Sequence, residues 1–133
     1  MTSNRSGGEV GRPKVVLGAA WTVEYAVDAK GNSPARDFVE ALPPDELAKI
    51  ARLFQWLADL ALGDRVNPEK FKQLEGKIHE LKSYQIRIPC FRDGRCWVLT
   101  HGFRKKKDSV PRAEIDRAHR IRDEDLSRRP PSR

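Results

Sequence analysis

The sequence is short of several features that would place it in well-known functional classes. It holds only two cysteines, Cys90 and Cys96, which are too few for a disulfide framework and, without matching ligands nearby, for a zinc site. No uncharged apolar run approaches the roughly 20 residues that cross a bilayer. A glycine-rich phosphate loop, a serine nucleophile motif and a metal-ligand spacing are also missing. We therefore expect a cytoplasmic protein that uses no metal, no cofactor and no membrane.

The size and composition favour one folded domain with polar ends. The chain has 133 residues, of which 38% are hydrophobic and 34% are charged, so it has enough apolar side chains to fold. Residues 1–13 are rich in serine, glycine and arginine, and residues 127–133 contain Pro130 and Pro131. We predict disordered segments over 1–13 and 127–133 and a single domain over 14–126.

Positive charge is concentrated near the C-terminal end. The net charge is +7, and residues 101–133 contribute 11 basic and 6 acidic side chains. Such a concentration attracts a polyanion or an acidic protein, because counterion release and electrostatic steering both grow with local charge. Solvated basic tails show the same pattern, so the charge alone does not decide between these interpretations.

Hydrophobic periodicity predicts an α+β fold. The alternation from Ala19 to Val27 is typical of a strand, and the apolar spacing of three and four from Asp45 to Leu62 is typical of a helix. A shorter helix begins at Pro34 and ends before Pro43. The other expected elements are strands over 71–74, 77–81, 84–92 and 95–103, forming an antiparallel meander, and a helix from 111 to about 125.

Two expected turns set the register of the meander. Asp93-Gly94 is typical of a two-residue hairpin turn, whose central positions both need a positive φ. On the core face it places these pairs opposite each other: Cys90 with Trp97, Ile88 with Leu99, Ile86 with His101, and Tyr84 with Phe103. A second turn at Lys82-Ser83 brings Glu80 to the same face as Arg87. The register also puts Cys90 and Cys96 on opposite faces, which argues against a disulfide.

The groups left to carry chemistry are Arg87, Glu80 and the basic run 104–107. Arginine and lysine stabilise the negative charge that develops on a phosphodiester during cleavage, while a base takes the proton from an attacking 2′-hydroxyl. RNA supplies that nucleophile itself, so the step needs no metal. The alternatives are a solvated basic loop and an ion pair between Arg87 and Glu80 across the strands. We expect His79 and His101 to be structural.

Four segments in series resemble a known toxin family. They are Leu74–Lys82 (LEGKIHELK), Tyr84–Ile88 (YQIRI), His101–Lys106 (HGFRKK) and Pro111–Ala118 (PRAEIDRA). In this order and spacing they resemble the HigB-like, phage-derived branch of the RelE/ParE superfamily, the toxins of bacterial type II toxin–antitoxin pairs. The resemblance covers roughly residues 19–125.

This resemblance implies a RelE-like α+β fold, with two N-terminal helices packed on a mostly antiparallel sheet of four to five strands and a C-terminal helix. It also implies ribonuclease activity on messenger RNA, often at the ribosome. The catalytic residues that it implies are Arg87, Lys105, Lys106 and, from the E-L-R motif, Glu80; whether a lysine or Glu80 is the general base stays open. We expect further RNA contacts from Lys82, Arg104, Lys107 and Arg112.

The resemblance implies a protein partner as well. In the family this is an antitoxin, commonly a helix-turn-helix protein, that covers the active face. The chain departs from the family at Lys82, which stands in place of an arginine and so keeps the charge but loses the bidentate fork. Two other functions stay open: a ParE-like toxin that inhibits a target such as gyrase without cleaving RNA, and a basic nucleic-acid-binding module.

Overall fold

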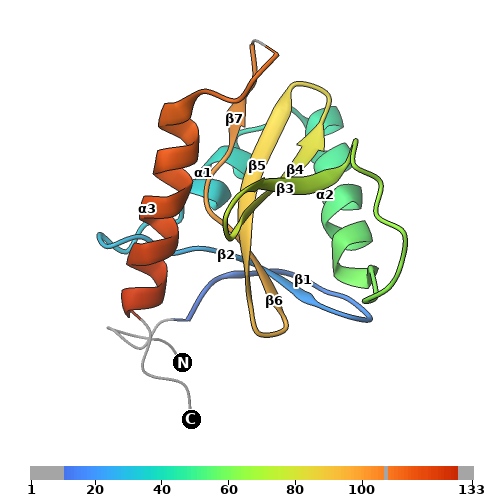
Figure 1. The fold of residues 1–133 in the computed structure, drawn as a ribbon, viewed down its shortest axis with the longest axis horizontal. Helices are drawn as coiled ribbons and strands as arrows, with labels where there is room; N and C mark the ends of the chain where they lie inside the picture. The colour runs from blue at the N-terminus through green and yellow to red at the C-terminus, as the bar shows by residue number, and fades with distance from the viewer. Residues whose placement is uncertain (1–10, 107, 129–133) are drawn as a thin grey trace.

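The computed structural model describes residues 11–106 and 108–128. Along the chain its elements are β1 (Lys14–Leu17), β2 (Thr22–Tyr25), α1 (Pro34–Glu40), α2 (Pro44–Asp59), β3 (Phe71–Glu75), β4 (Ile78–Ser83), β5 (Ile86–Asp93), β6 (Cys96–Leu99), β7 (Phe103–Arg104) and α3 (Arg112–Arg128). Figure 1 shows α2 and α3 on opposite sides of β4 and β5. None of the helices in these residue ranges combines the length and apolar character that a bilayer crossing requires.

The strands form one mixed sheet in the order β1-β2-β6-β5-β4-β3. β2 and β6 run parallel, whereas the other neighbours are antiparallel. β7 pairs with the first two residues of β5, beyond the end of β6. The α+β prediction is confirmed, but the predicted four to five strands are too few, because the described residues form seven.

The two additional strands have sequences that periodicity does not single out. β1 has no fully buried position, since Lys14 and Leu17 are exposed and Val15 and Val16 are half-buried. Its pattern therefore lacks the alternation of a strand with one buried face. β7 lies inside the single strand predicted over 95–103 and is separated from β6 by residues 100–102.

The hairpin between β5 and β6 turns one residue later than predicted. Asp93 lies opposite Cys96, so the turn residues are Gly94 and Arg95, and Cys90 lies opposite Leu99 instead of Trp97. Gly94 has a φ of 62° at the first central position, which is the pattern of a type II′ turn. The register moves by two residues, and a shift by two keeps the side chains of β5 and β6 on their predicted faces. β7 pairs with β5 one further residue out of register, so Phe103 lies on the Arg87 face and the prediction that it is on the core face opposite Tyr84 is wrong.

The hairpin between β4 and β5 also turns later than predicted. Ser83 lies opposite Ile86, so Tyr84 and Gln85 form the turn, and Lys82 rather than Ile78 lies opposite Arg87. Tyr84 is not a core residue: it is 78% exposed and adopts a φ of 55°. The prediction of a turn at Lys82-Ser83 is therefore wrong, because it rests on the preference of turns for polar residues and Tyr84 takes a turn position instead.

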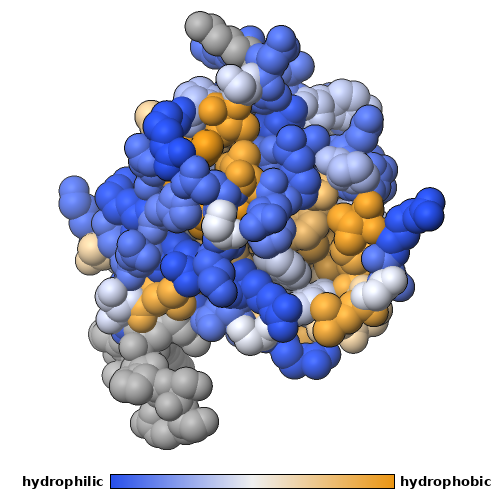
Figure 2. Space-filling view, viewed as in Figure 1, coloured by the Kyte–Doolittle hydropathy of each residue, from blue (hydrophilic) through white to orange (hydrophobic). Residues whose placement is uncertain are grey.

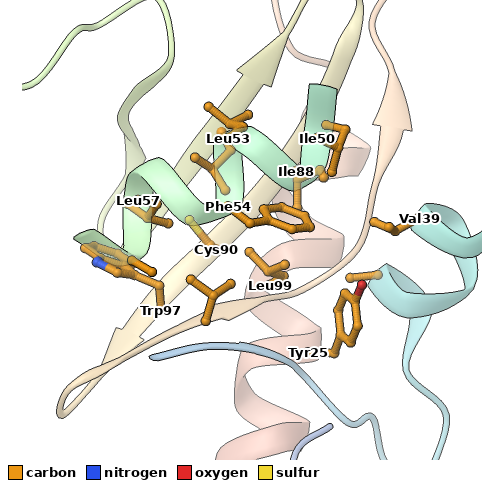
Figure 3. Close-up of a cluster of buried hydrophobic side chains, with 14 of the residues drawn as sticks. Tyr25, Val39, Ile50, Leu53, Phe54, Leu57, Ile88, Cys90, Trp97 and Leu99 are labelled. Carbon is orange, nitrogen blue, oxygen red and sulfur yellow. The ribbon is translucent and has the colours of Figure 1, made fainter. Parts of the chain in front are cut away.

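Helices α1 and α2 cover one face of the sheet with a hydrophobic core. Figure 3 shows α2 side chains directed at the strands. The residues of this cluster that the figure labels are Tyr25, Val39, Ile50, Leu53, Phe54, Leu57, Ile88, Cys90, Trp97 and Leu99. All of them are buried, which confirms the helical periodicity predicted for this part of the chain.

Helix α3 covers the other face with a smaller apolar cluster. Ala118 and Ile121 of the helix pack with residues of three strands, namely Ile78, Phe91 and Val98. Cys96 packs against this second cluster, whereas Cys90 belongs to the first. The predicted placement of the two cysteines on opposite faces is therefore confirmed, and both thiols are free.

The two ends of the described chain are joined by a buried ion pair. Residues 1–10 and 129–133, within the predicted disordered segments, lie outside the described residues. Arg12, placed in the disordered segment by sequence, is instead buried, and its Nη2 lies 2.6 Å from Oδ1 of Asp125 in α3. α3 continues to Arg128, beyond the predicted end of the domain at residue 126. The described residues therefore include Arg12 and Arg128, which lie beyond the predicted domain bounds of 14 and 126.

Gly102 lies where α1 approaches the sheet closely. A Cβ atom at this position would lie 2.2 Å from Cδ2 of Phe38. Overpacking of this kind costs about 1–3 kcal/mol, so we expect Gly102→Ala to lower the free energy of unfolding by that amount in urea denaturation. In a Phe38→Ala background the cost should fall below about 0.5 kcal/mol, because the clashing ring is gone. An equal cost in both backgrounds contradicts this explanation.

Candidate active site

Arg87 lies on the sheet face that α3 covers, at the start of β5. Its neighbours across the ladders are Lys82 on β4 and Phe103 on β7. The guanidinium donates through Nη1 to the carbonyl oxygens of Tyr84 and Ile86. Within residues 11–106 and 108–128, its buried Nε has no hydrogen-bond partner. The backbone therefore holds Arg87 in place and leaves a donor unused.

Glu80 lies on the same face but deeper. It is 1% exposed and lies opposite Pro89 on β5 and Lys72 on β3. Its Oε2 is 4.0 Å from Nζ of Lys72, and its buried Oε1 has no hydrogen-bond partner among the described residues. No salt bridge joins it to Arg87 in the same part of the chain, so the predicted alternative of an Arg87–Glu80 ion pair is wrong. A carboxylate so deeply buried has almost no surface through which to contact a ligand directly.

Lys82 is the half-buried lysine beside Arg87. Burial, reinforced by the charges of Lys72 and Arg87, lowers the pKa of Lys82, while Glu80 acts in the opposite direction. A lysine whose pKa is lowered releases its proton more readily than an ordinary lysine. The sequence had suggested only an RNA contact for this residue.

Lys105 extends the same face beyond β7. Its backbone N–H donates to the carbonyl oxygen of Gln85 at 2.7 Å, so the chain stays paired with the β4–β5 turn. Because side chains alternate along an extended chain, Lys105 follows Phe103 on the Arg87 side. We call Lys82, Arg87 and Lys105 the Arg87 cluster. Lys106 is exposed, and Lys107 lies outside the described residues.

Two predicted RNA-binding arginines are engaged elsewhere. Arg104 lies on the opposite face and forms a bidentate pair with Glu46 of α2, at 2.9 and 2.6 Å. Arg112 forms a bidentate pair with Glu75 at 2.6 and 2.8 Å. The structure thus brings Lys82 and Lys105 to Arg87 and does not bring Arg104 there. On the side of α3 and β3 the surface is mainly hydrophilic (Figure 2).

Lys72 is a neighbour of this site that the sequence reasoning missed. It lies in the predicted strand 71–74, but its position opposite Glu80 depends on the register of β3 against β4. Gly76, with a φ of 55°, marks the turn between these strands. The turn residues are Gly76 and Lys77, so Gly76 was a signal for the turn, but the irregularity between Gln73 and Glu75 that sets Lys72 opposite Glu80 has no signal in the sequence.

His101 is buried at the break between β6 and β7. Its Nδ1 lies 3.1 Å from Oγ1 of Thr100, and its Nε2 lies 3.0 Å from Oε1 of Glu114 in α3. Because an ionised carboxylate only accepts, Nε2 carries a proton and donates to Glu114, while the Thr100 hydroxyl beside Nδ1 donates to the carbonyl oxygen of Pro89 at 3.1 Å. Burial, helped by the charges of Arg117 and Arg120, lowers the pKa of His101 to about 3. His101 is thus neutral at pH 7, and it does not lie opposite Ile86 as predicted, because Arg104 does.

The lowered pKa of His101 predicts acid sensitivity. Below pH 6.5, the ordinary pKa of histidine, His101 takes up a proton in the unfolded chain but stays neutral in the folded chain. The free energy of unfolding therefore falls as the pH falls from 6.5 towards 3. The loss is at most about 1.4 kcal/mol per pH unit. We expect His101→Gln to flatten the change in urea midpoint between about pH 7.5 and about pH 5. A wild-type slope that survives this substitution contradicts the assignment.

Comparison with known proteins identifies the family of this chain. The model of the family described as phage derived protein Gp49-like (DUF891) matches residues 37–123, well over half of the chain. The chain belongs to this family. Gp49-like proteins are a toxin-type family related to the RelE/HigB toxin superfamily. The Gp49-like segment runs from α1 into α3 and contains the whole Arg87 cluster. No match to a curated protein was found.

Proposed function

We propose that this Gp49-like protein is the toxin of a type II toxin–antitoxin pair, of the HigB-like branch, and that it cleaves messenger RNA. The observation that carries the proposal is the Arg87 cluster. It combines an arginine fixed by backbone carbonyls, a half-buried lysine with a lowered pKa and a second lysine just beyond the adjoining strand. Such a set suits a reaction in which negative charge develops on phosphorus and two protons move.

The reaction needs only groups of the RNA and of this chain. The 2′-oxygen attacks the adjacent phosphorus while the bond from phosphorus to the 5′-oxygen breaks, giving a 2′,3′-cyclic phosphate and a 5′-hydroxyl. We assign the stabilisation of the phosphorane to Arg87. Lys82 takes up the 2′-hydroxyl proton in its neutral amine form. Lys105 or Lys106 then delivers a proton to the leaving 5′-oxygen. Glu80 positions the lysines through its charge.

The proposal includes partners for the basic surface. The substrate is messenger RNA, in keeping with the ribosome-bound substrates that the family resemblance implies. The antitoxin is a protein encoded by the adjacent gene, commonly of the helix-turn-helix type, and it covers the Arg87 cluster. An acidic segment of such an antitoxin complements the same positive charge that attracts RNA.

Primer extension after brief induction in a bacterium tests the proposal. The comparison is between the wild-type chain and the Arg87→Ala/Lys105→Ala/Lys106→Ala variant. We expect growth arrest and new 5′ ends in transcripts with the wild type, and neither with the variant. Growth arrest with DNA damage signalling but intact transcripts favours the ParE-like alternative. Neither arrest nor new ends leaves a nucleic-acid-binding module.

A further inference from the structure

A basic groove runs from α2 to the turn between β4 and β5, next to the Arg87 cluster. It has a volume of about 600 Å³, which lies within the range of ligand sites. Lys49 and Arg52 of α2 and Lys70, just before β3, line it together with one acidic residue, Glu69. The groove is therefore positively charged and open to a polyanion.

Two aromatic residues line the same groove. Tyr84 is 78% exposed, and Nζ of Lys49 lies 4.6 Å from the centre of its ring. Nζ of Lys70 lies 5.2 Å from the centre of the Trp56 ring. Aromatic rings that alternate with cations match a nucleic-acid strand, since bases stack on the rings while phosphates meet the cations.

The exposure of Tyr84 is accompanied by backbone strain. In the described residues it is the one non-glycine residue with a positive φ, at 55°. Bulky residues rarely adopt this conformation, and such outliers cluster at functional sites. A glycine or an asparagine would suit this turn position better, so folding alone does not explain an aromatic ring directed into solvent.

The groove is continuous with the Arg87 cluster. Lys82 lines the groove and also lies opposite Arg87 in the sheet. Arg87 in turn donates to the carbonyl oxygen of Tyr84. A strand whose phosphate lies at Arg87 therefore reaches the groove with its next nucleotides.

We infer that this groove binds the single-stranded RNA segment next to the cleaved phosphate. At least one base stacks on Tyr84, and backbone phosphates contact Lys49 and Arg52. The inference rests on the proposed function for its substrate, but binding and cleavage are separate measurements. An acidic peptide would use the same cations, yet it has no base to stack on the exposed ring, so the aromatic residues favour RNA.

Fluorescence anisotropy of a labelled oligouridylate of about eight nucleotides, titrated with the full chain, tests the inference. Tyr84→Gly removes the ring at a position where glycine is unstrained, so this variant is expected to fold. Lys49→Ala/Arg52→Ala removes two groove cations. Lys30→Ala/Arg36→Ala is the matched control, because it removes two exposed cations outside the groove lining. Circular dichroism checks that all variants are folded.

We expect Tyr84→Gly to weaken binding about tenfold, the effect of losing one stacked base. Lys49→Ala/Arg52→Ala should weaken it at least as much and flatten its salt dependence, whereas the control pair stays within about twofold of the wild type. Tyr84→Trp should bind the oligonucleotide as the wild type does, because it keeps an aromatic ring at this position. Wild-type affinity in both groove variants overturns the inference, as does failure of the wild type to bind the oligonucleotide.

Two further outcomes separate this inference from the proposed function. If an oligoglutamate peptide competes at the same concentration as the oligouridylate and its binding shows the same loss in Tyr84→Gly, the groove is a protein-docking site and the inference is overturned. If the groove variants lose RNA binding but the wild type yields no new transcript ends, the groove inference stands and the cleavage proposal fails.

Discussion

Replacing Arg87 with alanine is expected to lower RNA cleavage by about 100-fold or more and to abolish growth arrest. Removing one preorganised donor from a developing oxyanion typically costs that factor, and Arg87 is the donor that the backbone fixes most firmly in this site. Cleavage measured by primer extension after timed induction gives the rate. The fold should persist, because Arg87 is only half-buried at the end of its strand.

Two matched variants sharpen this prediction. Arg87→Lys keeps the charge but loses the planar fork, so it should retain only a small part of the activity. Arg92→Ala removes an arginine of the same strand at its other end, where the guanidinium lies 5.0 Å from the centre of the Trp21 ring. That variant should cleave as the wild type does. RNA cleavage at the wild-type rate in Arg87→Ala would contradict the assignment of the active site.

Asp125→Ala is expected to destabilise the protein by about 3–5 kcal/mol, a large part of the stability of a small domain. The Asp125 side chain is 1% exposed and lies 2.6 Å from the equally buried Arg12. Its Oδ2 also accepts a hydrogen bond from the backbone N–H of Val27 at 2.9 Å. The substitution leaves both a buried cation and a buried N–H short of a partner. Urea denaturation measures the loss.

The control for this prediction is Asp123→Ala on the same helix. Asp123 has a side chain that is 74% exposed and lies 3.7 Å from Arg122, so its removal should change stability by less than about 0.5 kcal/mol. Similar losses in the two variants point to helix propensity rather than to the buried ion pair. The Arg12→Ala variant should match Asp125→Ala, because it breaks the same pair.

The sequence predicts elements better than registers in this protein. α2 could be predicted because its apolar residues repeat at helical spacing over four turns, and Ile50, Phe54 and Leu57 do lie in the core. The helix ends at Asp59, before the predicted end at Leu62, and Leu62 is exposed. The hairpin registers could not, since turn composition favoured Lys82-Ser83 and Asp93-Gly94 while the chain turns at Tyr84-Gln85 and Gly94-Arg95. The faces of β4, β5 and β6 were predicted correctly despite those errors, because their pairing moved by an even number of residues. The faces of β7 were not, because its pairing moved by three.

The candidate site was predicted in part for the same reason. Lys82 lies beside Arg87 although the sequence predicts Lys82 in a turn. Lys105 joins them because β7 pairs with β5 an odd number of residues away from the predicted register, which reverses the predicted face of Phe103. Arg104 was grouped with its lysine neighbours by sequence proximity, yet alternation along β7 sends it to Glu46 on the opposite face. The partnership of Arg12 with Asp125 spans almost the whole chain, and no local pattern carries such information.

The 5′ end chemistry of RNA fragments from briefly induced cells tests the central claim most directly. Attack by the 2′-oxygen leaves a 5′-hydroxyl, so fragment ends should ligate to an adapter only after phosphorylation by a kinase, and they should vanish with Arg87→Ala. New ends that carry a 5′-phosphate, or wild-type growth arrest without new ends, would contradict the account.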